Sequence, residues 1–178
     1  MKTVTISAPD ASRSLKPLDK KYIILLIYTP LVVILDQVVK IYVDRSMYLY
    51  ESIEVVENFF NFTYIRNKGA AFGILSGADP SLRIPFFISV SVIAIGVIIY
   101  ILYTYKGRTG LYPASLSLIL GGAIGNMIDR VRLGEVIDFI DVHWHGSHWP
   151  AFNIADSAIT IGVSILILHM LTEKEEKS

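Results

Sequence analysis

Two aspartates in apolar surroundings are the residues of this chain best suited to chemistry. Asp138 lies in the sequence VIDFI and Asp156 in NIADS. Burial disfavours the charged form of a carboxyl group, and two neighbouring carboxylates do not both ionise readily, so such a pair tends to share one proton near neutrality. One carboxyl group can then take a proton from water while the other donates one to a carbonyl oxygen. If the chain between them folds back, the pair predicts hydrolysis of an amide bond without a metal.

Other polar residues interrupt the apolar sequence, and each also has a purely structural interpretation. Asp36 and Lys40 are four residues apart, so on a helix they can form a simple ion pair. Asp129 and Arg130 can end a helix at a membrane interface. Asn153 can cap a helix that begins directly after it.

The elements that must position these residues are four long apolar stretches. The chain of 178 residues is 53% hydrophobic and 18% charged, whereas a soluble domain carries about a quarter charged residues. A membrane span needs roughly 20 mostly apolar residues, and four stretches approach or exceed that length: residues 22–43, 84–105, 111–128 and 155–171. We therefore expect an all-α integral membrane protein with four transmembrane helices.

Basic residues predict how these spans are oriented. Nine Lys and Arg residues lie in the leading segment 1–21, the short connection after residue 105 and the tail 172–178, against six in the segments 44–83 and 129–154. Since cytoplasmic segments carry the excess of Lys and Arg, both termini are expected in the cytoplasm and the two longer loops outside it.

This orientation brings polar residues from three spans to one depth. Asp36 lies 14 residues into the first span, which is about 21 Å along a helix axis and therefore in the outer third of the membrane. Asn126 and Asp129 fall at the outer end of the third span, and Asp156 at the outer start of the fourth. The structural interpretations do not explain this shared depth, which predicts a site near the outer surface.

The first outer loop contains a strand pattern. The stretch ESIEVVENFFNFTYIRN, residues 51–67, alternates polar and apolar residues and is rich in Val, Ile, Phe and Tyr, so it predicts one or two short strands that lie on the membrane surface. It leads into Asn67 and Gly69, where an amide and a small residue would allow close approach to a ligand. The alternative is an ordinary turn.

The second outer loop contains the histidine-rich sequence HWHGSHW. His143, His145 and His148 are clustered, and clustered imidazoles can bind zinc. The alternative is an interfacial loop whose Trp144 and Trp149 lie among lipid headgroups. The sequence leaves both interpretations open.

Composition excludes some functions and leaves others in competition. The 16 basic and 16 acidic residues balance, so nucleic acid is not expected as a partner. The absence of cysteine excludes disulfides and thiol nucleophiles. A proton-coupled transporter or lipid flippase using Asp36 and Asp156 is the alternative to hydrolysis, although the inner halves of the spans offer no polar path. The second alternative to hydrolysis is a membrane scaffold without catalytic activity.

Several blocks of this sequence together resemble one known family, lipoprotein signal peptidase (signal peptidase II). The blocks are Asp36-Gln37-x-x-Lys40, NKGAAFGIL (67–75), GGAIGNMIDR (121–130), GEVIDFIDVHW (134–144) and FNIADSAITIG (152–162). Their order and spacing and the four-span pattern match over about residues 22–171. The long leading arm and the HWHGSHW segment are not part of the shared pattern.

The resemblance implies an aspartic endopeptidase of the bacterial inner membrane that removes signal peptides from prolipoproteins, just before a diacylglyceryl-modified cysteine. It implies Asp138 and Asp156 as the catalytic pair and a small sheet formed by residues 51–66. Substrate-binding or supporting positions are implied, or expected by their place in the matching blocks, at Asp36, Lys40, Asn67, Gly69, Asn126, Asp129, Arg130 and Asn153. No cofactor or metal is expected for the reaction. The expected partners are the lipidated substrates and membrane lipids, and the chain is expected to be a monomer.

Overall fold

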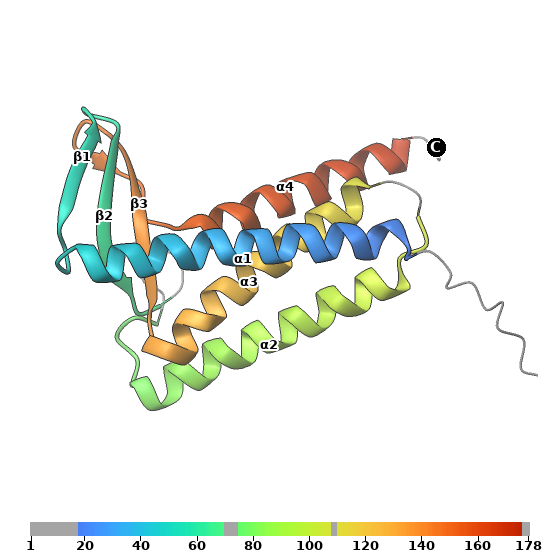
Figure 1. Ribbon diagram of the computed structural model, residues 1–178, viewed down its shortest axis with the longest axis horizontal. Helices are drawn as coiled ribbons and strands as arrows, with labels where there is room; N and C mark the ends of the chain where they lie inside the picture. The colour runs from blue at the N-terminus through green and yellow to red at the C-terminus, as the bar shows by residue number, and fades with distance from the viewer. Residues whose placement is uncertain (1–17, 70–74, 108–109, 176–178) are drawn as a thin grey trace, which may run out of the picture.

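Four long helices form the body of the protein. A computed structural model describes residues 18–69, 75–107 and 110–175. The helices are α1 (Lys20–Ser46), α2 (Pro80–Thr104), α3 (Leu111–Leu133) and α4 (Ile154–Glu175), and they lie along one another in Figure 1. Each is long and apolar enough to cross a membrane, with mean hydropathy between 1.4 and 2.6. The predicted fold class is confirmed, while most of the leading arm lies outside the described residues.

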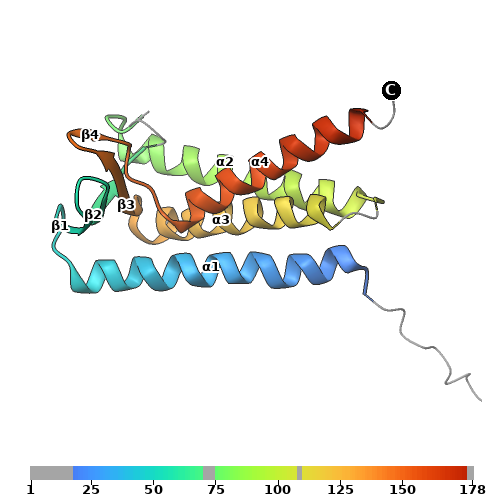
Figure 2. The same ribbon diagram turned by 90° about the horizontal axis from the view of Figure 1, so that it is seen from above.

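Helix α3 is the centre of the bundle. It packs against α1, α2 and α4, and Figure 2 shows it between α1 and the other two helices. Its glycines permit this packing: a Cβ atom on Gly122 would collide with the main-chain oxygen of Ala155 on α4, and one on Gly121 with Val32 on α1. Small residues let membrane helices approach closely.

A small antiparallel sheet lies at one end of the bundle, away from the carboxyl terminus (Figure 1). Its strands are β1 (Ser52–Val56), β2 (Phe60–Asn67), β3 (Val136–Trp144) and β4 (Ser147–His148), in that order across the sheet. The strands predicted within 51–67 are present as β1 and β2. The expected outer loop 129–154 contains strand β3, which was not predicted and which pairs along the length of β2.

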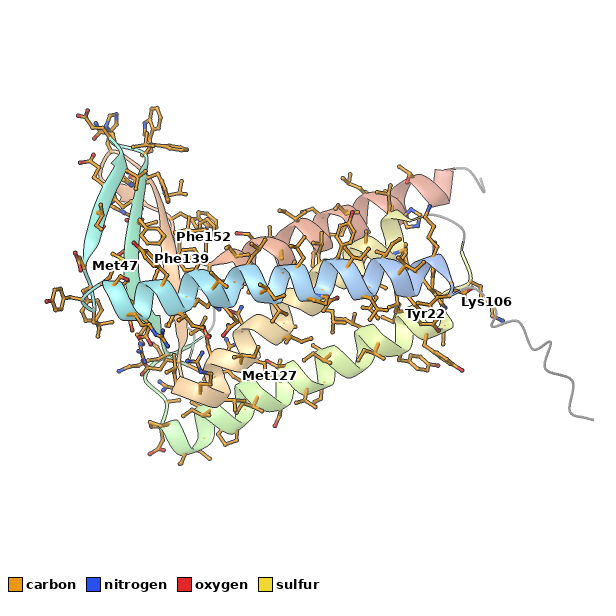
Figure 3. All side chains as sticks on the ribbon, in the orientation of Figure 1. Tyr22, Met47, Lys106, Met127, Phe139 and Phe152 are labelled. Atoms are coloured by element: carbon orange, nitrogen blue, oxygen red, sulfur yellow. The ribbon has the colours of Figure 1, made fainter. Side chains whose placement is uncertain are left out.

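The sheet is fixed to the end of α1. Val43 of α1 packs with Tyr64, Ile137 and Phe139 in one buried cluster, and Figure 3 shows Met47 and Phe139 at this end of the molecule, opposite Tyr22 and Lys106. Tyr64 donates a hydrogen bond to Asp44, as does Arg66 at 2.7 Å. Strands β2 and β3 are therefore held where α1, α3 and α4 meet them.

Helices α3 and α4 extend beyond the stretches that were predicted to span the membrane. Helix α3 continues past residue 128 to Leu133, where Gly134 ends it with a φ of 73°. Helix α4 begins at Ile154 and continues to Glu175. Hydropathy marks the apolar centre of a span, but polar residues at its ends stay helical when their side chains find partners in the fold.

Candidate active site

A buried ion cluster joins α1 to α3. The ammonium group of Lys40 lies 2.8 Å from Asp36 and 2.9 Å from Asp129, and all three side chains are at most 1% exposed. The predicted Asp36–Lys40 ion pair is confirmed. Asp129 does not end a helix as one interpretation had it, because it lies inside α3 and closes this cluster.

The two aspartates of the cluster also accept main-chain hydrogen bonds from α4 and β3. Asp36 accepts a hydrogen bond of 2.9 Å from the main-chain N–H of Ala155, at the start of α4. Asp129 accepts one of 3.1 Å from the N–H of Ile137 on β3. The cluster therefore fixes the two segments that carry Asp138 and Asp156.

Asp138 is held by two amide side chains. It lies on β3, 2% exposed, and accepts hydrogen bonds from Asn67 of β2 at 3.0 Å and from Asn153 at 2.7 Å. The pKa of Asp138 is raised to about 7, first by burial and then by the negative charge of Asp156, while the hydrogen bonds from the two amides and the charge of Lys40 oppose the rise. The raised pKa agrees with the prediction from the apolar sequence around this residue.

Asp156 lies in the first turn of α4. Its carboxyl group accepts a hydrogen bond of 2.7 Å from Asn126 of α3, and its N–H donates to the side-chain oxygen of Asn153 at 2.9 Å. Asn153 is therefore the predicted cap of α4. An anion in this position also interacts favourably with the helix dipole.

Asparagines connect the ion cluster to both carboxyl groups. The side-chain oxygen of Asn126 accepts from Lys40 at 3.0 Å and from Asn153 at 3.2 Å, which leaves its amide nitrogen to donate to Asp156. Lys40 thus determines which way the Asn126 amide points. The predicted convergence of polar residues from three spans is confirmed.

The expected site residues fall into two groups around one cavity. A cavity of about 1040 Å³ lies between the sheet, α3 and α4, and its lining includes Asn67, Gly69, Asn126, Arg130, Asp138 and Asp156. The other expected residues, Asp36, Lys40, Asp129 and Asn153, do not line it. They lie buried behind it and hold the lining residues in place through the contacts above.

Two lining residues have contacts that explain their positions. Gly69 donates its N–H to the side-chain oxygen of Asn67 at 2.9 Å, which turns the Asn67 amide nitrogen towards Asp138. The guanidinium of Arg130 lies 5.0 Å from the ring centre of Phe87 on α2. Arg130 is thereby held in the lining without a carboxylate partner at ion-pair distance among the described residues.

Sequence reasoning missed some residues that shape the site. Gln37 donates to Asp129 and to the main-chain oxygen of Gly125, both at 3.1 Å. The segment from Trp149 to Phe152 forms one wall of the cavity, and the pairing of Phe152 with Ile140 on β3 positions it. The signal for β3 was the content of Val, Ile, Phe and Trp in residues 136–144, which favours a strand, but these residues do not alternate strictly with polar ones.

Four helices able to span a membrane and two carboxyl groups in one cavity fit a membrane-embedded aspartic peptidase. Residues 28–172 match the family model described as signal peptidase (SPase) II, and the chain belongs to this family. It is accordingly an aspartic endopeptidase and a multi-pass bacterial membrane protein. This assignment excludes the transporter and scaffold alternatives.

Two named relatives and one solved structure support the same family assignment. The chain is 54% identical to a lipoprotein signal peptidase of Geobacter sulfurreducens over 82% of this chain and 89% of the relative. It is 50% identical to a lipoprotein signal peptidase of Syntrophus aciditrophicus over 89% of this chain and 99% of the relative. A bacterial membrane enzyme solved in meso at 2.3 Å resolution is similar with a TM-score of 0.79 and 39% identity, over 86% of this chain and 91% of that one.

Proposed function

We propose that this enzyme cleaves prolipoproteins on the amino-terminal side of a diacylglyceryl-modified cysteine, with Asp138 and Asp156 as the catalytic pair. The observation that carries the proposal is the raised pKa of Asp138 beside Asp156 in one cavity. A protonated and an ionised carboxyl group are what an aspartic peptidase needs at neutral pH.

The contacts support a separate role for each carboxyl group. Asp156, which accepts a hydrogen bond from Asn126, acts as the base that takes a proton from the attacking water. Asp138 acts as the acid that donates its proton to the oxygen of the scissile carbonyl. Asn67 and Asn153 hold both oxygens of Asp138 in place, and Arg130 faces the charge that develops in the cavity.

The cavity also suits a lipidated substrate at a membrane surface. Its lining combines the polar residues described above, which include Asp138 and Asp156, with the apolar side chains of Phe152 and of Ile159 and Ile161 on α4. Acyl chains lie against such side chains while the peptide bond reaches the carboxyl groups and water. We propose that this end of the bundle lies at the outer face of the bacterial inner membrane, that both termini are cytoplasmic, and that the enzyme acts as a monomer among membrane lipids.

The test is cleavage of a purified diacylglyceryl-modified prolipoprotein by the parent and by Asp138→Asn and Asp156→Asn. Each substitution keeps the shape and removes the acid or the base, so each should lower kcat by at least about 10³-fold. Asp79→Asn is the control, because Asp79 only caps α2 through the N–H of Ser81 and asparagine caps equally well. Cleavage that persists in either pocket variant, with the fold intact, would overturn the assignment of the pair.

A further inference from the structure

A second group of ionisable side chains lies on the sheet, outside the cavity. Asp141 and His143 are two residues apart on β3, and His148 on β4 is the direct cross-strand partner of His143. One ligand atom from each of the three residues lies within 4.8 Å of the others. Because side chains alternate along a strand, Asp141 and His143 lie on the face of β3 opposite to Asp138.

The three residues are already arranged around one another. Nδ1 of His148 lies 2.9 and 3.0 Å from the two carboxylate oxygens of Asp141, and the rings of His143 and His148 are stacked with centres 4.6 Å apart. Asn61 on β2 donates to Asp141 at 3.2 Å. A hydrogen bond of this kind orients a carboxylate that ligates a metal.

His143 supplies an independent observation. Its side chain is buried, with 8% exposed, and its Nδ1 atom has no hydrogen-bond partner among the residues that the structure describes. A buried polar atom without a partner is destabilising. A cation bound to Nδ1 of His143 removes that deficit, because the lone pair of this nitrogen then has a partner.

We propose that Asp141, His143 and His148 bind a Zn²⁺ ion. Two imidazoles and one carboxylate form a donor set that zinc prefers, with a water as the fourth ligand. A tetrahedral zinc site places ligand atoms about 3.3 Å apart, and the half-exposed His148 can rotate to close the remaining gap. His145, at the tip of the same hairpin, does not belong to the cluster.

The ion has a structural consequence for the cavity. Strand β4 leads directly into Trp149, whose N–H donates to the oxygen of Val142 on β3 at 2.9 Å, and the wall of the cavity follows from there. Zinc therefore fixes β4 to β3 and stiffens the start of that wall. It takes no part in the cleavage reaction.

The first experiment measures Zn²⁺ bound to the full chain, purified in detergent without a histidine tag, stripped with a chelator and dialysed against Zn²⁺. About one ion per chain is expected in the parent, and at least tenfold weaker binding in Asp141→Asn and His148→Gln. His145→Gln is the matched control from the same hairpin, and Asp138→Asn excludes binding in the cavity. Both controls should bind as the parent does.

A spectroscopic measurement does not depend on how the variants fold. The parent loaded with Co²⁺ should show the visible absorption bands of a tetrahedral nitrogen and oxygen site, and Zn²⁺ should abolish them by displacement. A parent that binds no stoichiometric ion, or one whose binding is unchanged in both Asp141→Asn and His148→Gln, overturns the proposal. Neither result bears on the proposed peptidase activity, which is measured separately.

Discussion

Asn153 donates a hydrogen bond of 2.7 Å to Asp138 and is itself fully buried. The oxygen of the same side chain accepts from the N–H of Asp156. One asparagine therefore positions both carboxyl groups of the proposed pair, one through its nitrogen and the other through the helix that it caps.

Replacing Asn153 separates these two contributions. Asn153→Ala removes the cap and the donor, so it should destabilise the fold by about 1–2 kcal/mol and lower cleavage by roughly 10–100-fold. Asn153→Asp keeps the cap but places an anion beside Asp138, so it should lower cleavage with less loss of stability. Thermal unfolding and kcat measured on the same preparations check both. An Asn153→Asp enzyme as active as the parent would contradict the positioning role.

The pH dependence of cleavage should follow the proton on Asp138. With the pKa of Asp138 raised to about 7, kcat/KM should fall about tenfold per pH unit above that value, because the acid loses its proton. Initial rates between pH 5 and 9, on a substrate without titrating groups in this range, measure it. A profile that stays flat to pH 9 is the contrary result.

The same carboxyl group should make stability depend on pH. Its folded pKa is about 7 and its ordinary value 3.8, so between these values the folded state binds more protons than the unfolded state, and stability falls as pH rises. Asp138→Asn removes this slope, and relative to the parent it should gain up to about 4 kcal/mol from pH 4 to pH 8. Unfolding midpoints of both proteins across this range provide the test, and parallel curves would refute it.

Lys40 should be far more important for folding than a lysine on the surface. Lys40→Met leaves Asp36 and Asp129 buried without their cation, which should destabilise the fold by about 3–5 kcal/mol. The triple variant Asp36→Asn/Lys40→Met/Asp129→Asn should recover part of this loss, since no charge is left unpaired.

Lys68→Met is the matched control for Lys40→Met. Lys68 is 54% exposed and 3.9 Å from Glu135, so its loss should change stability by less than about 1 kcal/mol. Equal effects of Lys40→Met and Lys68→Met on the unfolding midpoint would rule out the buried cluster as a determinant of the fold.

Replacement of two helix glycines by alanine should change stability in different ways. Gly122→Ala drives a methyl group into the main chain of α4 at Ala155, so it should destabilise the bundle by about 1–3 kcal/mol and displace Asp156. Gly96 on α2 has no atom within 4 Å of an added Cβ, so Gly96→Ala should be neutral or stabilise by up to about 1 kcal/mol. Thermal unfolding and cleavage of the two variants make the comparison, and a similar loss in both would reject close α3–α4 packing as its cause.

Much of the architecture could be predicted because it depends on local composition. The apolar lengths predicted four spans, the alternation along 51–67 predicted β1 and β2, and the depth of Asp36, Asn126 and Asp156 predicted that they meet. The strand β3 was not predicted, because its pattern is interpretable as a strand only once β2 lies beside it. The continuation of α3 through Asp129 was missed for a related reason: a charged residue stays in a buried helix only when a partner such as Lys40 neutralises it.

The sequence by itself determined that the chain crosses a membrane four times and which residues are able to perform chemistry, since hydrophobic length and side-chain type are properties of the chain. Only the tertiary structure decided that Asn67 and Asn153 hold Asp138, that Asn126 holds Asp156, and that Lys40 lies behind them. Some of these contacts join residues far apart in the chain: Asn67 and Asp138 are 71 positions apart, and Lys40 and Asn126 are 86. Their geometry depends on how closely α3 approaches its neighbours and on the register between β2 and β3, which no local pattern specifies.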